Sequence, residues 1–167
     1  VKALMLSLQA FSLFDSVKVR EFSLEALWAH SWGVGCLARH IAACEGRPTA
    51  EVETAFTAGL LHDVGKLVLI NGVPHGWEEA VDTAAAEALP LWRAERNRLG
   101  ACHAEVGASL LAMWGLSDAI VEAVAFHHEP ELCGSHSFTA LTSVHAANLL
   151  AHQRRQQDDI RYLEAVG

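Results

Sequence analysis

Basic side chains are scarce in this chain. Its 167 residues include 12 Lys and Arg against 20 Asp and Glu, which gives a net charge of −8 at pH 7 with His neutral. A protein that binds a nucleic-acid backbone generally needs clustered Lys and Arg to neutralise phosphates. The composition therefore argues against a nucleic-acid partner.

Paired cysteines and membrane-length apolar runs are also lacking. The four Cys residues form no C-x-x-C motif and follow no secretory signal, so we expect reduced thiols in a cytoplasmic protein. The longest uncharged run, 132–153, contains three His, an Asn and several hydroxyl side chains, which are unfavourable in hydrocarbon. The sequence therefore predicts neither disulfides nor a transmembrane span.

Alternating polarity is nearly absent, whereas apolar residues, 51% of the chain, recur at helical spacing. Caps and breakers divide this pattern into helices. We expect helices from Ser23 to about 44, from a Thr49 cap to 72 with an end at His62-Asp63, and over 77–88, 91–98, 103–114, 117–128 and 137–157. The sequence predicts a single all-α domain, a helical bundle that spans 1–167.

The first long helix should bury one stripe of side chains. Residues three and four apart share a helix face, and on this helix they are mostly apolar. The predicted stripe comprises Leu24, Leu27, Trp28, Ser31, Val34, Leu37 and Ile41. At the start of the chain, VKALMLSLQAF has helical spacing without a preceding cap, so we expect 1–14 to be the end of an upstream helix and the domain to be truncated.

Histidines and one aspartate fall at helix ends or on an inward face in four separate segments. His30 lies on the predicted buried stripe, and the other five follow or begin helices: His62, Asp63, His103, His127 and His128. Helical bundles build metal sites from such side chains on facing helices. Imidazole and carboxylate, without thiolate at suitable spacing, suit iron, manganese, nickel or zinc. The pattern predicts a site for one or two divalent ions.

The adjacent residues carry further information. Neighbours on a regular helix point about 100° apart, so we expect His127 and His128 to serve two ions rather than one. The two oxygens of Asp63 could bridge such a pair, and Lys66, one turn after His62, could steady a phosphoryl oxygen. If the site hydrolyses phosphate esters, Asp63 and Lys66 are the predicted catalytic residues.

Each of these residues also has a simpler explanation. A single histidine on an apolar face, such as His30, is more often hydrogen-bonded within a core than bound to metal. His127-His128 before Pro130 could be a helix C-terminus favoured by the helix dipole. The other histidines have no convergent context and are predicted to lie on the surface: His40, His75, His136 and His152.

The motifs together resemble one family in order and spacing. They are His30-Ser31, AGLLHDVGKLVL, HAEVGASLLAMWGLSDAIVEAVAFHHEP and SVHAANLLA, which cover most of the chain. They resemble the HDOD domain, the HD-related output domain of bacterial signalling proteins and a relative of the HD-GYP phosphodiesterases within the HD superfamily. The resemblance implies further helices upstream and partners among signalling domains or proteins. Because the sequence predicts no transmembrane span, we expect no membrane partner.

The resemblance also implies a ligand set. It places metal ligands at His30, His62, Asp63, His103, His127 and His128, with Lys66 as the basic neighbour. Active members carry a further Asp on the last helix, where this chain has Asn148. Loss of that charge near two ions is worth about 4 kcal/mol at an effective dielectric of 20. We therefore expect that one ion is lost, unless His145 or His152 on the same face replaces the missing ligand.

Two further departures bear on activity. HD-GYP enzymes carry a D-G-x-G-Y-P loop after the paired histidines, whereas this chain runs EPELCGSHSF, and it has Ala26 where they tend to place a Glu. Cyclic di-GMP hydrolysis is therefore disfavoured. Two hypotheses remain: a non-catalytic regulatory output domain with a partly retained metal site, or a metal-dependent phosphohydrolase that acts on a nucleotide or another phosphate ester.

Overall fold

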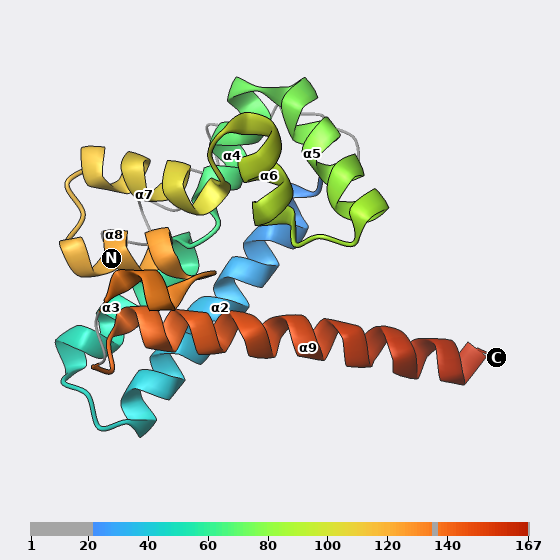
Figure 1. Cartoon of the computed structure of the whole chain (residues 1–167). Helices are drawn as coiled ribbons and strands as arrows, with labels where there is room; N and C mark the ends of the chain where they lie inside the picture. Colours follow the sequence, from blue (N-terminus) through green and yellow to red (C-terminus); the bar gives the residue numbers. More distant parts are fainter. Residues whose placement is uncertain (1–21, 135–136, 167) are drawn as a thin grey trace.

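The computed structural model describes residues 22–134 and 137–166, with the side chains of 154–166 left out of the description. Helices occupy most of this part of the chain, which contains no strand (Figure 1). The prediction of an all-α bundle is confirmed. None of the described helices has the length and apolarity that a membrane span requires. The expected upstream helix at 1–14 lies outside the described residues.

The first described helix, α2 (Leu24–Cys44), begins as predicted, because the Ser23 hydroxyl accepts a hydrogen bond from the Ala26 amide at 3.1 Å. Its buried face is narrower and lined with smaller residues than the sequence predicts. Small side chains lie at the centre of the interface with α3, so larger residues of the predicted stripe are only half-buried. The buried residues are Leu27, Ser31, Val34, Gly35, Ala38 and Ala42; Leu24, Trp28, Leu37 and Ile41 are half-buried.

The second predicted segment divides into two helices, α3 (Thr49–Leu61) and α4 (Val64–Gly72). Pro48 rather than Thr49 is the N-cap, a difference of one residue. The expected end at His62-Asp63 is confirmed, since His62 caps the C-terminus of α3 and Asp63 the N-terminus of α4. Two buried polar residues therefore form the whole connection between these helices.

A short pair of helices follows, α5 (Pro74–Glu87) and α6 (Leu91–Leu99). Helix α5 begins three residues earlier than predicted because Pro74 occupies its first turn, where the missing N–H is not needed. Ala88, at a φ of 52°, and Pro90 separate the two helices.

The chain then forms α7 (His103–Met113), α8 (Asp118–Phe126), a 3-10 turn η1 (Pro130–Cys133) and α9 (Ala140–Val166). Helix α9 starts three residues later and ends nine residues later than predicted. It packs against α2, α3 and α8 and then continues past the body of the domain to the C-terminus (Figure 1).

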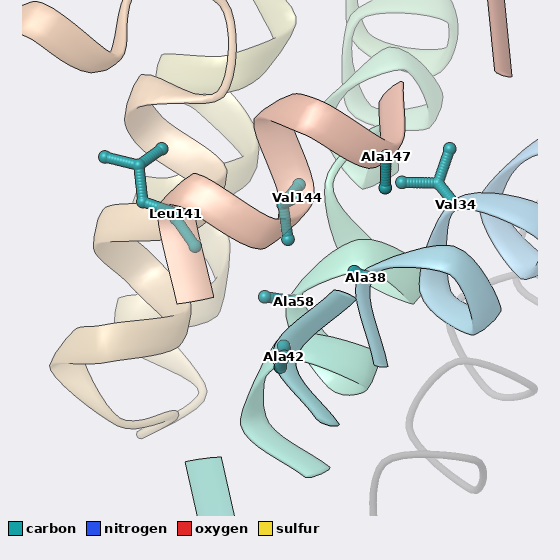
Figure 2. Packing of buried hydrophobic residues seen from close by; sticks show 9 residues of the cluster. Val34, Ala38, Ala42, Ala58, Leu141, Val144 and Ala147 are labelled. Carbon is teal, nitrogen blue, oxygen red and sulfur yellow. The ribbon is translucent and has the colours of Figure 1, made fainter. Parts of the chain in front are cut away.

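Two apolar clusters meet beneath the ends of α3 and α8. One joins α2, α3, α8 and α9 and includes Val34, Ala38, Ala58, Val144 and Ala147 (Figure 2). The other joins α2, α3, α4, α7 and α8 and includes Leu61 of α3. Because α3 and α8 contribute to both clusters, the residues that follow their last turns lie at the junction between them.

Glycines allow two close helix crossings. A Cβ atom added to Gly59 of α3 would lie 2.8 Å from the Gly35 Cα of α2. A Cβ atom added to Gly65 of α4 would overlap the His103 carbonyl oxygen and lie 2.7 Å from the Gly107 nitrogen of α7. No side chain larger than hydrogen fits at Gly59 or Gly65 unless the helices move apart.

Candidate metal centre

The predicted residues converge around Asp63, whose carboxylate is 2% exposed. Its Oδ2 atom faces two imidazole nitrogens, at 3.8 Å from His30 Nε2 and 3.4 Å from His62 Nε2. One ligand atom from each of these three residues lies within 4.8 Å of the others. Two ligands of one transition ion, each bound at about 2.1 Å, are themselves about 3 to 3.5 Å apart. We call His30, His62 and Asp63 the aspartate triad.

A second group of three imidazoles lies on the other side of the carboxylate. His103 Nε2 is 3.2 Å from Asp63 Oδ1 and 3.0 Å from His128 Nε2. His127 completes this group, and one ligand atom from each histidine lies within 4.8 Å of the others. We call His103, His127 and His128 the imidazole triad. Asp63 thus presents one oxygen to each triad.

The expectation that the His127 and His128 rings point apart is wrong, and their assignment to two ions stays a prediction. Their ring centroids are 4.0 Å apart and both rings belong to the imidazole triad. The expectation assumed a regular helix, but α8 ends at Phe126 with His127 as its C-cap. Beyond the last helical turn, the 100° separation of neighbouring side chains no longer applies.

Hydrogen bonds on the far side of three rings fix their orientation. His62 Nδ1 donates to the Gly59 carbonyl at 2.7 Å, and His127 Nδ1 donates to the Val124 carbonyl at 2.8 Å. His103 Nδ1 donates to the Glu95 carboxylate at 2.6 Å. Metal-binding histidines usually make such bonds, because a proton held at Nδ1 leaves the Nε2 lone pair available for the ion.

Several buried atoms at the centre have no protein hydrogen-bond partner. They are the Nε2 atoms of His30, His62 and His127 and the Oδ1 atom of Asn148. A buried polar atom without a partner is unfavourable unless another group binds it. Each of these atoms carries a lone pair, which a divalent cation can accept. The residues present therefore fit a metal ion.

Burial keeps most of the imidazoles neutral. It lowers the pKa of His30 to about 4 and that of His128 to about 2, and it also lowers the pKa of His62 and His127. Only neutral imidazole can bind a metal ion. Four of the five rings are thus in the binding form at neutral pH.

The two remaining ligand groups, Asp63 and His103, each lie beside groups of opposite charge. Burial opposes ionisation of Asp63, but His62, Lys66 and His103 outweigh it and hold the pKa of the carboxyl well below its usual range. Burial and Lys66 lower the pKa of His103, but hydrogen bonds to the Asp63 and Glu95 carboxylates outweigh them and raise it. Metal binding at His103 therefore requires loss of a more tightly held proton.

Helix α6 supports the imidazole triad through residues that the sequence analysis missed. Glu95 is fully buried and accepts hydrogen bonds from both His103 Nδ1 and the His103 amide. Trp92 stacks on His128 with centroids 5.6 Å apart, and Arg96 binds the Glu129 carboxylate at 2.7 Å. One signal was available: Glu95 lies three residues after Trp92 and next to Ala94, a charged residue on an otherwise apolar face.

Helix α9 covers the centre from another side. Asn148 is buried, as the implied ligand position requires. The Nδ1 atom of His145 donates to the His127 carbonyl at 2.7 Å, so this atom does not replace the missing carboxylate. His152 is exposed as predicted, but its ring lies 5.2 Å from that of His30, so the prediction that it has no convergent context is wrong.

The other histidines predicted to lie on the surface do not join the centre. His40 is exposed with its Nε2 atom 3.6 Å from Cys44 Sγ, and His75 is exposed beside Glu79. His136 lies outside the described residues. None of the four Cys forms a disulfide, as predicted; Cys36 and Cys44 are exposed, Cys102 is buried and Cys133 is half-buried.

A cavity of about 370 Å³ leads to the imidazole triad. Apolar side chains from α6 and α9 form part of its wall, and polar groups converge at its floor. Its lining comprises Lys66, Pro90, Leu91, Trp92, His103, His127, His128, His145, Asn148, Leu149 and His152. The imidazole triad is thus open to small molecules, whereas His30, His62 and Asp63 do not line this cavity.

The fold and the site define an all-α domain with a buried cluster of histidines and one aspartate. Residues 1–130 match the family model of the HDOD domain, and the chain belongs to this family. The resemblance inferred from the sequence motifs is therefore confirmed.

Solved structures share this fold. An HDOD domain protein of unknown function from Geobacter sulfurreducens has a TM-score of 0.79 and 28% identity, over 92% of this chain and 50% of its own. The MmoQ response regulator from Methylococcus capsulatus has a TM-score of 0.65 and 28% identity, over 87% of this chain and 56% of its own. An uncharacterized protein from Treponema pallidum is 26% identical over 102 residues, which are 61% of this chain and 20% of that protein. The chain therefore spans about half the length of these solved relatives and about a fifth of the length of the Treponema pallidum protein.

Proposed function

We propose that this chain is a regulatory output domain of a bacterial signalling protein, located in the cytoplasm, with a divalent metal ion in a structural rather than catalytic centre. Its partners are other signalling domains or proteins. Membership of the HDOD family and similarity to a response regulator support the signalling role. The four cysteines, none of which forms a disulfide, suit a reducing compartment.

The composition of the centre is the observation that carries the proposal. Five imidazoles and one carboxylate surround it, and the neutral amide of Asn148 lies where the resemblance implies a second carboxylate. Imidazole nitrogens bind iron, manganese, nickel or zinc well, but they do not offset ionic charge. Two dications sharing a single carboxylate would repel each other strongly in a buried site. The donor set thus favours one ion.

A phosphohydrolase remains the second candidate, because the cavity connects solvent to the imidazole triad and Lys66 lies on its wall. A metal ion bound there would supply Lewis-acid activation of a phosphate ester. Lys66 would bind a phosphoryl oxygen, and Trp92 would contact an apolar or aromatic part of a nucleotide. Asp63, fully engaged by its neighbours, would orient the imidazoles.

Metal content and turnover, measured together, distinguish the two functions. Protein purified without a nickel affinity column should carry at most one ion per chain by elemental analysis and should not hydrolyse a generic phosphodiester with added Mn²⁺ or Fe²⁺. Two tightly held ions with turnover would establish the hydrolase and overturn the non-catalytic proposal. Absence of any metal after supplementation with either ion would rule out both the structural ion and the hydrolase.

A further inference from the structure

We propose that the Lys66 ammonium group occupies the cation position of the aspartate triad, so that the single metal ion binds at the imidazole triad. This inference rests on the proposed function, since it assumes that the centre binds metal. It assigns different occupants to the two halves of the cluster: a side-chain cation in one and a dication in the other.

The contacts of Asp63 carry the inference. Lys66 Nζ lies 2.5 Å from Asp63 Oδ2, the same oxygen that faces His30 and His62. The other oxygen, Oδ1, faces His103 of the imidazole triad. An ion in the aspartate triad would have to share Oδ2 with the ammonium group, whereas an ion in the imidazole triad approaches Oδ1 without this competition.

The local structure holds Lys66 in this place. It lies three residues after Asp63, on the first turn of α4, so both side chains project from the same end of the helix. The Lys66 side chain is only 19% exposed, and without a metal ion in the aspartate triad it is the cation that pairs the buried Asp63 carboxylate. The positive charge is therefore built into the fold.

The charge balance also favours one dication. Among the described side chains that contact the two triads, Asp63 and Glu95 are acidic, and Lys66 is cationic. One dication brings the sum of these charges to about +1, and a second brings it to about +3 in a buried region. Removal of the ammonium charge lowers the second sum and frees Oδ2 as a ligand.

Access from solvent also favours an ion at the imidazole triad over one at the aspartate triad. The cavity is lined by all three members of the imidazole triad, whereas no member of the aspartate triad lines it. Lys66 lines the cavity as well and lies between it and Asp63 Oδ2. An ion that enters from solvent thus meets the imidazole triad first.

The test counts bound Co²⁺ in tag-free protein by elemental analysis after equilibrium dialysis. We expect one ion in the wild type, two in Lys66→Met, which keeps the chain length but removes the charge, and one in Lys66→Arg. The double variant Lys66→Met/His62→Ala should return to one ion, because the new ion requires the aspartate triad. The count is repeated with His40→Ala, which removes the exposed imidazole beside Cys44 and reveals any ion bound there.

Two ions in the wild type, or one in Lys66→Met, would overturn the inference while leaving a metal centre in place. No ion in any of the four proteins would instead overturn the proposed function. Should Lys66→Met not fold, anomalous scattering from cobalt in wild-type crystals decides the matter. An ion among His103, His127 and His128 is the expected result, and an ion among His30, His62 and Asp63 would refute the inference.

Discussion

The two triads around Asp63 differ in the way the chain builds them. In the aspartate triad, the Gly59 carbonyl of α3 orients His62, and the Lys66 side chain of α4 pairs with Asp63. In the imidazole triad, side chains of α6 support two of the three rings, Glu95 under His103 and Trp92 against His128. A main-chain group therefore orients His62, whereas the support of His103 and His128 can be altered by side-chain substitutions that leave every ligand in place.

Acidification should have the largest effect on the metal-free protein. An unfolded histidine has a pKa of about 6.5, whereas burial lowers those of His30 and His128 to about 4 and about 2. The unfolded state takes up more protons as the pH falls below 6.5, so the free energy of unfolding decreases by about 1.4 kcal/mol per pH unit for each such group.

His30 and His128 should protonate at different pH values. His30 protonates near pH 4, before His128. His103, whose pKa is raised, has the opposite sign: its contribution is complete below pH 6.5 and is lost as the pH rises through its folded value. Urea unfolding between pH 7 and pH 4 measures the net effect. Constant stability over this range would show that the rings are not buried as neutral groups.

Removal of a ring from the imidazole triad should greatly weaken metal binding. We expect His127→Ala to weaken the affinity by at least about 100-fold, because a single remaining pair of imidazoles is a poor site. The exposed His75→Ala is the matched control and should bind normally. Calorimetric titration measures both. Equal affinities for the two variants would place the ion elsewhere.

Glu95→Gln tests the support from α6. The amide oxygen can still accept from His103, but the negative charge is lost, so metal affinity should fall by about 10- to 100-fold. Glu131→Gln, on the exposed surface of η1, is the control. The Co²⁺ absorption spectrum should change with Glu95→Gln, which a purely structural role would not require. An unaltered affinity and spectrum would limit Glu95 to packing.

Asn148→Asp should strengthen metal binding. A carboxylate would add a negative charge where an unpartnered amide oxygen now lies, and an increase of about tenfold corresponds to about 1.4 kcal/mol. Asn97→Asp makes the same change on the exposed side of α6 and should have no effect. If both variants gain equally, the cause is the net charge of the chain rather than the centre.

The smallest effect is expected for Trp92→Leu. The stack on His128 restricts that ring, so its loss should weaken the affinity a few-fold and speed metal dissociation. Trp114→Leu, at the exposed end of α7, is the control. Dissociation into excess chelator measures the rates, and equal rates would indicate that the stack does not hold the ring.

The sequence allowed prediction of the helices and of every member of both triads, because caps, breakers and helical spacing are local signals. His62-Asp63 is an example, since one short stretch specifies both the end of α3 and the start of α4. Glu95 could not be assigned in this way. Its role depends on α6 packing against the start of α7, a tertiary contact that spacing alone does not reveal.

The prediction that the His127 and His128 rings point apart is wrong for a different reason. Neighbouring side chains point about 100° apart only within a regular helix, and both residues follow the last helical residue of α8. Likewise, the predicted stripe of α2 follows from the helical spacing of apolar residues, whereas the close approach of α3 brings small residues to its centre. Helix ends and helix distances are set by three-dimensional packing, and both determine the fine structure of the centre.

The two glycine crossings have a consequence for the choice of ion. Gly59 against Gly35 sets the separation of the helices that carry His30 and His62, and Gly65 against Gly107 does so for Asp63 and His103. Backbone contacts of this kind leave no room for further compression and no adjustable side chain. The ligands therefore cannot move closer together for a smaller ion, and the imidazole-rich donor set disfavours Ca²⁺, which needs more oxygen ligands.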